Sequence, residues 1–108
     1  MTDCFQIDRA DNVATLLGDA AELAEVSIRG DGSGTIHAAQ TIRAGHKIAV
    51  AAIATGERVI KYGFPIGEAT QPIAPGEWVH LHNCRSLYDA RSSSLDIESG
   101  SPKETRYV

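Results

Sequence analysis

The sequence predicts a small, mainly β domain with one short helix near its N-terminus. At 108 residues the chain has room for one domain. Its middle segment contains short runs rich in Ile, Val and Ala, separated by glycine-containing turns about every ten residues, which is typical of a compact, curled β fold. Aromatic residues make up only 6% of the chain, so we expect an aliphatic core.

The first elements are predicted from local patterns. Asp11 and Asn12 are good helix caps and precede an apolar run, which predicts a helix of two turns over residues 13–18. Residues 24–28 alternate apolar and polar side chains, as a half-buried strand does. The glycine-rich segment 30–34 lacks the Lys-Ser/Thr ending of a phosphate-binding loop, so it predicts a connecting turn.

An internal repeat of the form Ile-x-x-Gly-x-x-(Ile/Val) occupies the middle of the chain. Its three copies are 42–48, 53–59 and 73–79. Each copy predicts an apolar anchor, a tight turn whose glycine takes positive φ, and a strand that starts two residues after the glycine. The expected strands are 47–52, 58–62 and 78–83, and the Gly- and Pro-containing segment 63–70 is expected to cross between the last two.

The pattern places the domain at residues 1–85 and a polar C-terminal arm at residues 86–108. The arm is rich in serine and has few core residues, so we expect it to be extended or partly disordered. An arm that docks on a partner would use the apolar side chains that are left there, which are Leu87, Tyr88, Leu95, Ile97 and Tyr107.

The charge distribution is uneven. The net charge is −4, but residues 43–85 carry five basic and three acidic side chains. This basic centre would favour a small anion, or it consists of solvated Lys and Arg side chains at strand edges. Lys and Arg are too sparse for a nucleic-acid footprint.

The two cysteines and the hydropathy indicate a cytoplasmic protein. Cys4 and Cys84 follow no signal peptide, so we expect reduced thiols. No apolar run reaches the roughly 20 residues that a membrane span requires.

Three histidines are the main candidates for chemistry. On a strand over 78–83, His80 and His82 would lie on one face together with Trp78, while Val79 and Leu81 would face the core. The pair could supply metal ligands or anion donors, or be ordinary surface histidines. His46 is either a partly buried structural histidine or an acid/base that acts with them.

A second group of candidates is cationic. Lys47 would point to the opposite side of its strand from His46, and Lys61-Tyr62-Gly63 places a cation and a phenol before a turn, where they could hold a carboxylate. A strand-end lysine is the simpler interpretation. No complete nucleophile and base set is assembled in the chain.

Four motifs together are specific to a known family. They are His46-Lys47, Lys61-Tyr62-Gly63, Ile66-Gly67-Glu68-Ala69-Thr70 and His80-Leu81-His82-Asn83. From about residue 11 to residue 85 the chain closely resembles the SAF domain of the altronate and galactarate dehydratases. The resemblance implies a β-clip fold and hydro-lyase chemistry on aldonates or aldarates, helped by a divalent metal such as iron in the complete enzyme.

The resemblance also implies a partner, because this domain is commonly an appendage of a much longer chain. We therefore expect the small subunit of an altronate dehydratase-type enzyme, inactive alone, which works with a large dehydratase subunit on a small anionic sugar acid. A homo-oligomer is a further expectation. The implied catalytic residues are His46, His80 and His82; the implied substrate contacts are Lys47, Lys61, Tyr62 and Asn83; the candidate metal ligands are His80 and His82.

Two other functions fit the same residues. The chain could be the small subunit of a sulfolactate sulfo-lyase, which would release sulfite in place of water. It could also be a non-catalytic module that binds a carbohydrate or anion, since similar domains occur in sialic-acid synthases, pilus-assembly proteins and antifreeze proteins. The histidine motifs favour the dehydratase branch.

Overall fold

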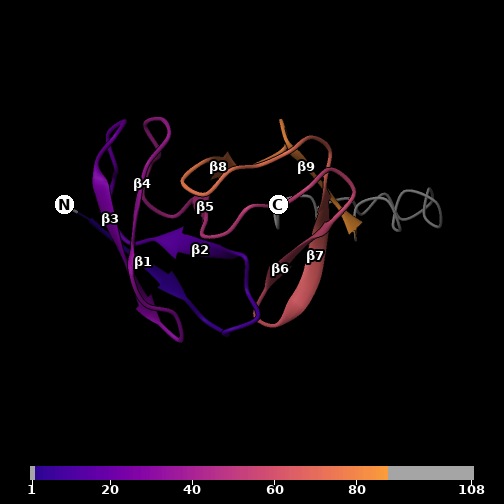
Figure 1. Ribbon diagram of the computed structural model, residues 1–108, viewed down its shortest axis with the longest axis horizontal. Helices are drawn as coiled ribbons and strands as arrows, with labels where there is room; N and C mark the ends of the chain where they lie inside the picture. The colour runs from indigo at the N-terminus through magenta and orange to yellow at the C-terminus, as the bar shows by residue number, and fades with distance from the viewer. Residues whose placement is uncertain (1, 88–108) are drawn as a thin grey trace, which may run out of the picture.

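The computed structural model describes residues 2–87, and these residues form two β-sheets (Figure 1). The strands are β1 (Thr2–Gln6), β2 (Val13–Leu16), β3 (Glu25–Gly30), β4 (Thr35–His37), β5 (Lys47–Ala49), β6 (Arg58–Lys61), β7 (Phe64–Ala69), β8 (Trp78–Val79) and β9 (Cys84–Ser86). The larger sheet has the order β4-β3-β1-β2-β5-β8 and the smaller one the order β6-β7-β9. The predicted all-β class is confirmed.

The predicted N-terminal helix is wrong, because residues 13–16 form the strand β2. This strand lies between β1 and β5 and is buried on both faces: Val13 belongs to one core cluster, and Ala14 and Leu16 belong to the other. Asn12 caps no helix. Its side-chain oxygen accepts a hydrogen bond from the Ile60 amide at 2.7 Å, and so it ties the start of β2 to β6. Tertiary packing therefore overrides the local helix signal.

The three repeats fold as predicted. Their glycines, Gly45, Gly56 and Gly76, have φ of 87°, 87° and 95°. Their anchors, Ile42, Ile53 and Ile73, are at most 2% exposed. The strands β5, β6 and β8 each begin two residues after the glycine, although β5 and β8 are shorter than expected. An isolated bridge joins Ile53 to Ile73, so two of the copies pair directly.

The segment 63–70 is mostly the strand β7, whereas the sequence predicted an irregular crossing. Tyr62 and Gly63 form a two-residue hairpin turn between β6 and β7 with φ of 61° and 77°, as a type I′ turn requires. Pro65 is tolerated because β9 pairs only with residues 67–69, so the proline lies where β7 has a single neighbour beside a register shift.

The other early predictions hold in part. Residues 24–28 lie in strand β3, apart from Ala24, and the segment 30–34 connects β3 to β4. The proposed domain boundary falls within β9, and the predicted arm, from residue 88 onward, lies outside the described residues. Within residues 2–87 no helix is long and apolar enough to cross a membrane.

Two core clusters fill the molecule. One joins the two sheets and consists of Val13, Ala49, Ile53, Val59, Ile66, Ala69, Ile73, Val79 and Cys84. The other packs within the larger sheet and consists of Cys4, Ala14, Leu16, Ala20, Val26, Ala38, Ile42 and Ile48. Since β5 contributes Ala49 to the first and Ile48 to the second, its two faces look into different parts of the molecule.

Candidate functional site

Four aromatic rings gather at the β5–β8 edge of the larger sheet. His46 directly precedes β5, Trp78 begins β8, and the backbone pairs Ile48 with Trp78. His80 and His82 follow β8. We refer to His46, Trp78, His80 and His82 as the ring cluster. Three residues that lie up to 36 positions apart in the sequence thus contact one indole, because two copies of the Ile-Gly repeat deliver adjacent strands.

The indole of Trp78 is the centre of the ring cluster. It stacks on His80 with ring centroids 5.1 Å apart and planes at 10°, and it lies 5.0 Å from His82 at 43°. His46 meets both Trp78 and His80 edge-on, at 5.5 Å and 5.6 Å. The cluster is partly exposed, with His82 at the surface. The imidazoles are therefore held together on one side of the molecule.

One hydrogen bond in the cluster defines the chemistry of His46. Trp78 Nε1 donates to His46 Nδ1 at 3.2 Å. An indole nitrogen can only donate, so Nδ1 must accept, and the neutral ring then carries its proton on Nε2. In this arrangement His46 presents an N–H donor to a ligand, and coordination of a metal through Nε2 would require loss of that proton.

A turn, not a strand, carries His80 and His82, so the predicted strand 78–83 is wrong beyond Val79. The Asn83 amide donates to the His80 carbonyl at 3.1 Å, which closes the turn. The Asn83 side chain accepts from the His80 amide at 3.0 Å and donates to the Trp78 carbonyl at 2.9 Å. Leu81, predicted to face the core, is 56% exposed. The turn still places both imidazoles against Trp78.

Asn83 is therefore a structural residue in this chain, whereas the sequence indicated a substrate contact. It is 1% exposed, and its amide group is occupied by the two backbone hydrogen bonds of the turn. These bonds pair the Trp78 carbonyl and the His80 amide at the point where β8 ends. Asn83 acts on the ring cluster by fixing the backbone that carries it.

The two candidate lysines are on strands β5 and β6. Lys47 pairs with Val79 and alternates with His46, so it is on the face of β5 that looks toward the smaller sheet. Burial, and then the charge of Lys61, lower the pKa of Lys47 from its ordinary 10.5, and Cys84 partly opposes this shift. Lys61 is buried, and its Nζ lies 3.8 Å from the centroid of the exposed Tyr62 ring.

Neither cysteine is an activated nucleophile. Cys4 is fully buried, and burial followed by the charge of Asp3 raises its pKa to about 11. Burial also raises the pKa of the Cys84 thiol, although Lys47 and the Glu68 backbone oppose this shift. Both thiols stay protonated near neutral pH and are free of disulfides.

A complete metal site is not formed by residues 2–87. No group of three or more His, Cys, Asp or Glu side chains in this range is arranged to hold a metal ion. Protein sites for zinc, for example, use three or four such ligands. The candidate ligands His80 and His82 would therefore require further ligands from elsewhere, and we derive no step through a metal here.

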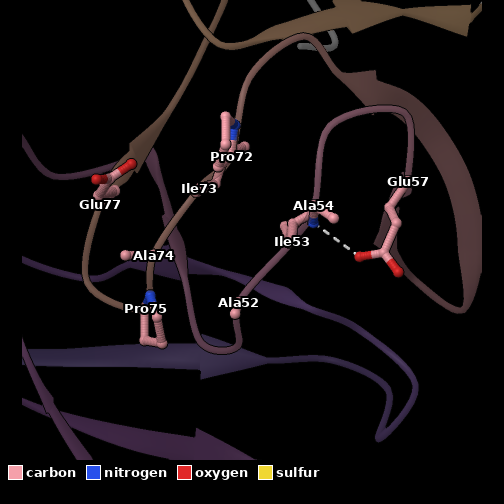
Figure 2. Close-up of a pocket in the computed structure, with 9 residues that line it drawn as sticks. All are labelled: Ala52, Ile53, Ala54, Glu57, Pro72, Ile73, Ala74, Pro75 and Glu77. Atoms are coloured by element: carbon pink, nitrogen blue, oxygen red, sulfur yellow. Dashed lines mark hydrogen bonds between the residues drawn. The ribbon is translucent and has the colours of Figure 1, made fainter.

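A hollow of about 540 Å³ is lined by other residues, which Figure 2 shows. It is formed where the segments joined by the Ile53–Ile73 bridge run side by side, and its lining is Ala52, Ile53, Ala54, Glu57, Pro72, Ile73, Ala74, Pro75 and Glu77. Its lining contains none of the candidate catalytic, substrate-binding or metal-ligating residues that the sequence indicated. Its only charged groups are two carboxylates, which disfavour an anionic ligand.

The sequence indicated the histidines but not the network that holds the neighbouring hairpin. Asp11 is buried; its carboxylate accepts from the Gly63 amide at 2.8 Å and from the Asp8 amide at 3.0 Å. Gln6, also buried, donates to the Asp11 carbonyl at 3.2 Å. The helix-cap interpretation of Asp11 is therefore wrong, and no local pattern indicates a partner 52 residues away.

These features define a β domain that presents clustered imidazoles and has, within residues 2–87, no group of three metal-ligating side chains. Residues 2–87 match the altronate/galactarate dehydratase SAF domain. The chain therefore belongs to this family, and the resemblance seen in the sequence is confirmed.

Individual relatives agree with this assignment. The chain is 47% identical to an altronate dehydratase from Escherichia coli over 82 residues, which are 76% of this chain and 16% of that protein. It is 36% identical to an altronate dehydratase from Bacillus subtilis over 103 residues, which are 95% of this chain and 19% of that protein. It is 48% identical to the alpha subunit of a (2R)-sulfolactate sulfo-lyase from Chromohalobacter salexigens over 42 residues. These residues are 39% of this chain and 45% of that protein.

The coverage of these relatives is uneven. The chain spans less than a fifth of the altronate dehydratases that it matches. The sulfo-lyase relative, in contrast, is named as a subunit and is a short chain, since 42 residues make up 45% of it. The domain is thus found in lyases both as a small part of a long chain and as a separate subunit.

Proposed function

We propose that this chain is the small SAF-domain subunit of a sugar-acid hydro-lyase of the altronate dehydratase type. It would remove water from an aldonate together with a separate large subunit, and it would be inactive alone. The observation that carries this proposal is the ring cluster, which brings three imidazoles to one indole at a sheet edge without completing a catalytic site. The relationship to dehydratases supports the reaction class.

In this proposal the ring cluster faces the large subunit and the substrate. Elimination of water requires a base at the carbon next to the carboxylate and stabilisation of the hydroxyl that leaves. His46 suits the second task, because its bond from Trp78 leaves Nε2–H as a donor. His80 and His82, on the turn fixed by Asn83, supply the remaining proton-transfer or ligand groups.

A divalent metal would act as a Lewis acid in the complete enzyme. Since residues 2–87 offer no set of three ligands, most of its ligands would come from the large subunit. A cytoplasmic location and a homo-oligomer stay predictions from the sequence.

The experiment is to mix the chain with the candidate large subunit and measure dehydration of altronate. We expect turnover only in the mixture, and about a hundredfold loss of kcat for His80→Ala or His82→Ala, the usual size of a lost acid/base or positioning group. His37→Ala is the matched control, because His37 is exposed on β4 and lies outside the ring cluster. Unchanged turnover in both cluster variants would refute the proposed role.

A second candidate is the small subunit of a sulfolactate sulfo-lyase. It is favoured by the short relative named as such a subunit. The same mixture supplied with (2R)-sulfolactate would release sulfite if this candidate is right. Binding of a sugar acid by the chain, with no turnover of either substrate by the mixture, would instead indicate a non-catalytic binding module.

A further inference from the structure

Two lysines enter the space between the two sheets from different strands. Lys47 begins β5 and shares a face with Ala49, and Lys61 ends β6 and shares a face with Val59. Ala49 and Val59 both belong to the core cluster that joins the sheets. Both side chains thus leave their strands on the side of the intersheet core, and the charge of Lys61 adds to burial in lowering the pKa of Lys47. The two cations therefore lie at one edge of the intersheet core.

The described carboxylates do not neutralise these cations. Across residues 2–87 the ion pairs are Arg29 with Asp3 and Arg85 with Glu68. Glu68, on the neighbouring strand β7, is held by Arg85 at 3.0 Å and is thus engaged elsewhere. Lys61 Nζ instead contacts the face of the Tyr62 ring.

Such an arrangement is unfavourable among residues 2–87 by themselves. Lys61 is 8% exposed and Lys47 is half-buried. Removing an ammonium group from water without a counter-ion costs several kcal/mol, and two like charges add to this cost. A fixed pair of such groups is therefore expected where an anion is to be received.

We propose that Lys47 and Lys61 together bind the carboxylate, or a similar oxyanion, of a ligand in the gap between the two sheets. This site is separate from the ring cluster, because Lys47 and His46 lie on opposite faces of β5. The ring of Tyr62 holds the Lys61 ammonium in place by a cation–π contact. The site does not depend on the proposed lyase activity, since an oxyanion would bind to the chain alone.

The hairpin that carries Lys61 is rigidly held, which suits a binding role. Asp11 accepts a hydrogen bond from Gly63 in the turn, and Asn12 binds the backbone of β6 through both of its side-chain polar atoms. The ammonium group thus approaches a ligand from a fixed strand end, and little entropy is lost on binding.

The test is a titration of the full chain with sulfate, gluconate and glucitol at constant ionic strength. Binding is measured by the change in the NMR chemical shifts of the backbone amides. Gluconate and glucitol share a polyol skeleton but differ in the carboxylate. We expect saturable binding of sulfate and gluconate, with shifts in β5 and β6, and none of glucitol. Lys61→Met and Lys47→Met should each weaken binding about tenfold, the effect of one lost charge-assisted contact.

The controls distinguish a site from general charge attraction. Arg58→Met removes the same charge from an exposed position on the same hairpin and should change affinity less than twofold. Lys61→Arg keeps the charge and should retain most of the binding. Absence of saturation with both anions, or equal weakening by Arg58→Met and Lys61→Met, would overturn the proposal.

The source of the oxyanion is then decided in the mixture with the large subunit. If the sugar acid fills the site, Lys61→Met raises KM and sulfate inhibits competitively. If a carboxylate side chain of the large subunit fills it, the same variant weakens assembly of the two chains and leaves KM unchanged. Turnover itself is not the readout, so failure of the lyase proposal would leave the titration result standing.

Discussion

The ring cluster and the lysines Lys47 and Lys61 meet at strand β5, because His46 precedes this strand and Lys47 begins it on the opposite face; the two groups differ in how their polar atoms are paired. In the ring cluster, Trp78 donates a hydrogen bond to His46, and Asn83 forms two hydrogen bonds with the turn that carries His80 and His82. The lysines, in contrast, have no counter-ion among residues 2–87. The ring cluster thus has defined hydrogen bonds of its own, whereas the two cations have no described acidic partner.

The largest expected effect is on the turn that supports the ring cluster. Asn83→Ala removes two buried hydrogen bonds and leaves the His80 amide and the Trp78 carbonyl without those partners. We expect a loss of about 2–3 kcal/mol in the free energy of unfolding, measured by urea denaturation. Leu81→Ala, an exposed change in the same turn, is the control and should cost less than about 0.5 kcal/mol. Equal losses would mean that Asn83 does not hold the turn.

This turn also shows how far the sequence could predict the site. The Ile-Gly repeat identified the anchors, the glycine turns and the starts of β5, β6 and β8, because each rule acts within seven residues. The juxtaposition of His80 and His82 was predicted from strand alternation, which is the wrong reason. Asn83 ends the strand after Val79 and still brings both rings to Trp78.

The remaining errors arise from contacts between distant segments. The capping residues Asp11 and Asn12 predicted a helix, but their side chains bind β6 and its hairpin turn, about 50 residues away. The burial of Lys61 beside the intersheet core depends in the same way on how one sheet packs on the other. A single sequence contains no local signal for either arrangement.

The next effect tests whether the indole sets the orientation of His46. Trp78→Phe keeps an aromatic ring between His80 and His82 but removes the donor to His46 Nδ1. We expect about a tenfold loss of kcat in the reconstituted enzyme, with little change in stability, because a hydrogen bond of about 1.4 kcal/mol corresponds to that factor.

The tautomer of His46 gives a readout that a purely structural role would not change. In the wild-type chain the ¹⁵N shifts of His46 should show the proton on Nε2, and in Trp78→Phe they should show a mixture of the two neutral forms. His80 and His82 receive no hydrogen bond from the indole nitrogen, since it donates to His46, and they serve as internal references. An unchanged His46 spectrum would show that Trp78 does not set its tautomer.

The smallest effect is the change in the free energy of unfolding caused by a substitution at Lys47. Its sign should be opposite to that of the substitutions in the ring cluster. Lys47→Met replaces a half-buried cation, which has no ion pair among residues 2–87, by an apolar side chain of similar length. Such replacements are often neutral or stabilising, so we expect the isolated chain to gain about 1 kcal/mol at neutral pH. Every substitution proposed for the ring cluster lowers activity or stability, whereas this one should raise stability while it weakens oxyanion binding.

The gain should depend on pH in a defined direction. The pKa of Lys47 is lowered in the folded chain relative to the unfolded one, so the burial penalty on the charged form is largest at low pH, where both states are protonated. As pH rises toward 10.5, the folded state releases its proton first and the penalty disappears. The advantage of Lys47→Met should therefore shrink with rising pH, as measured by urea denaturation between pH 7 and pH 10. An advantage that grows over this range would mean that the Lys47 charge is favourably paired in the folded chain, and the open oxyanion site would then be wrong.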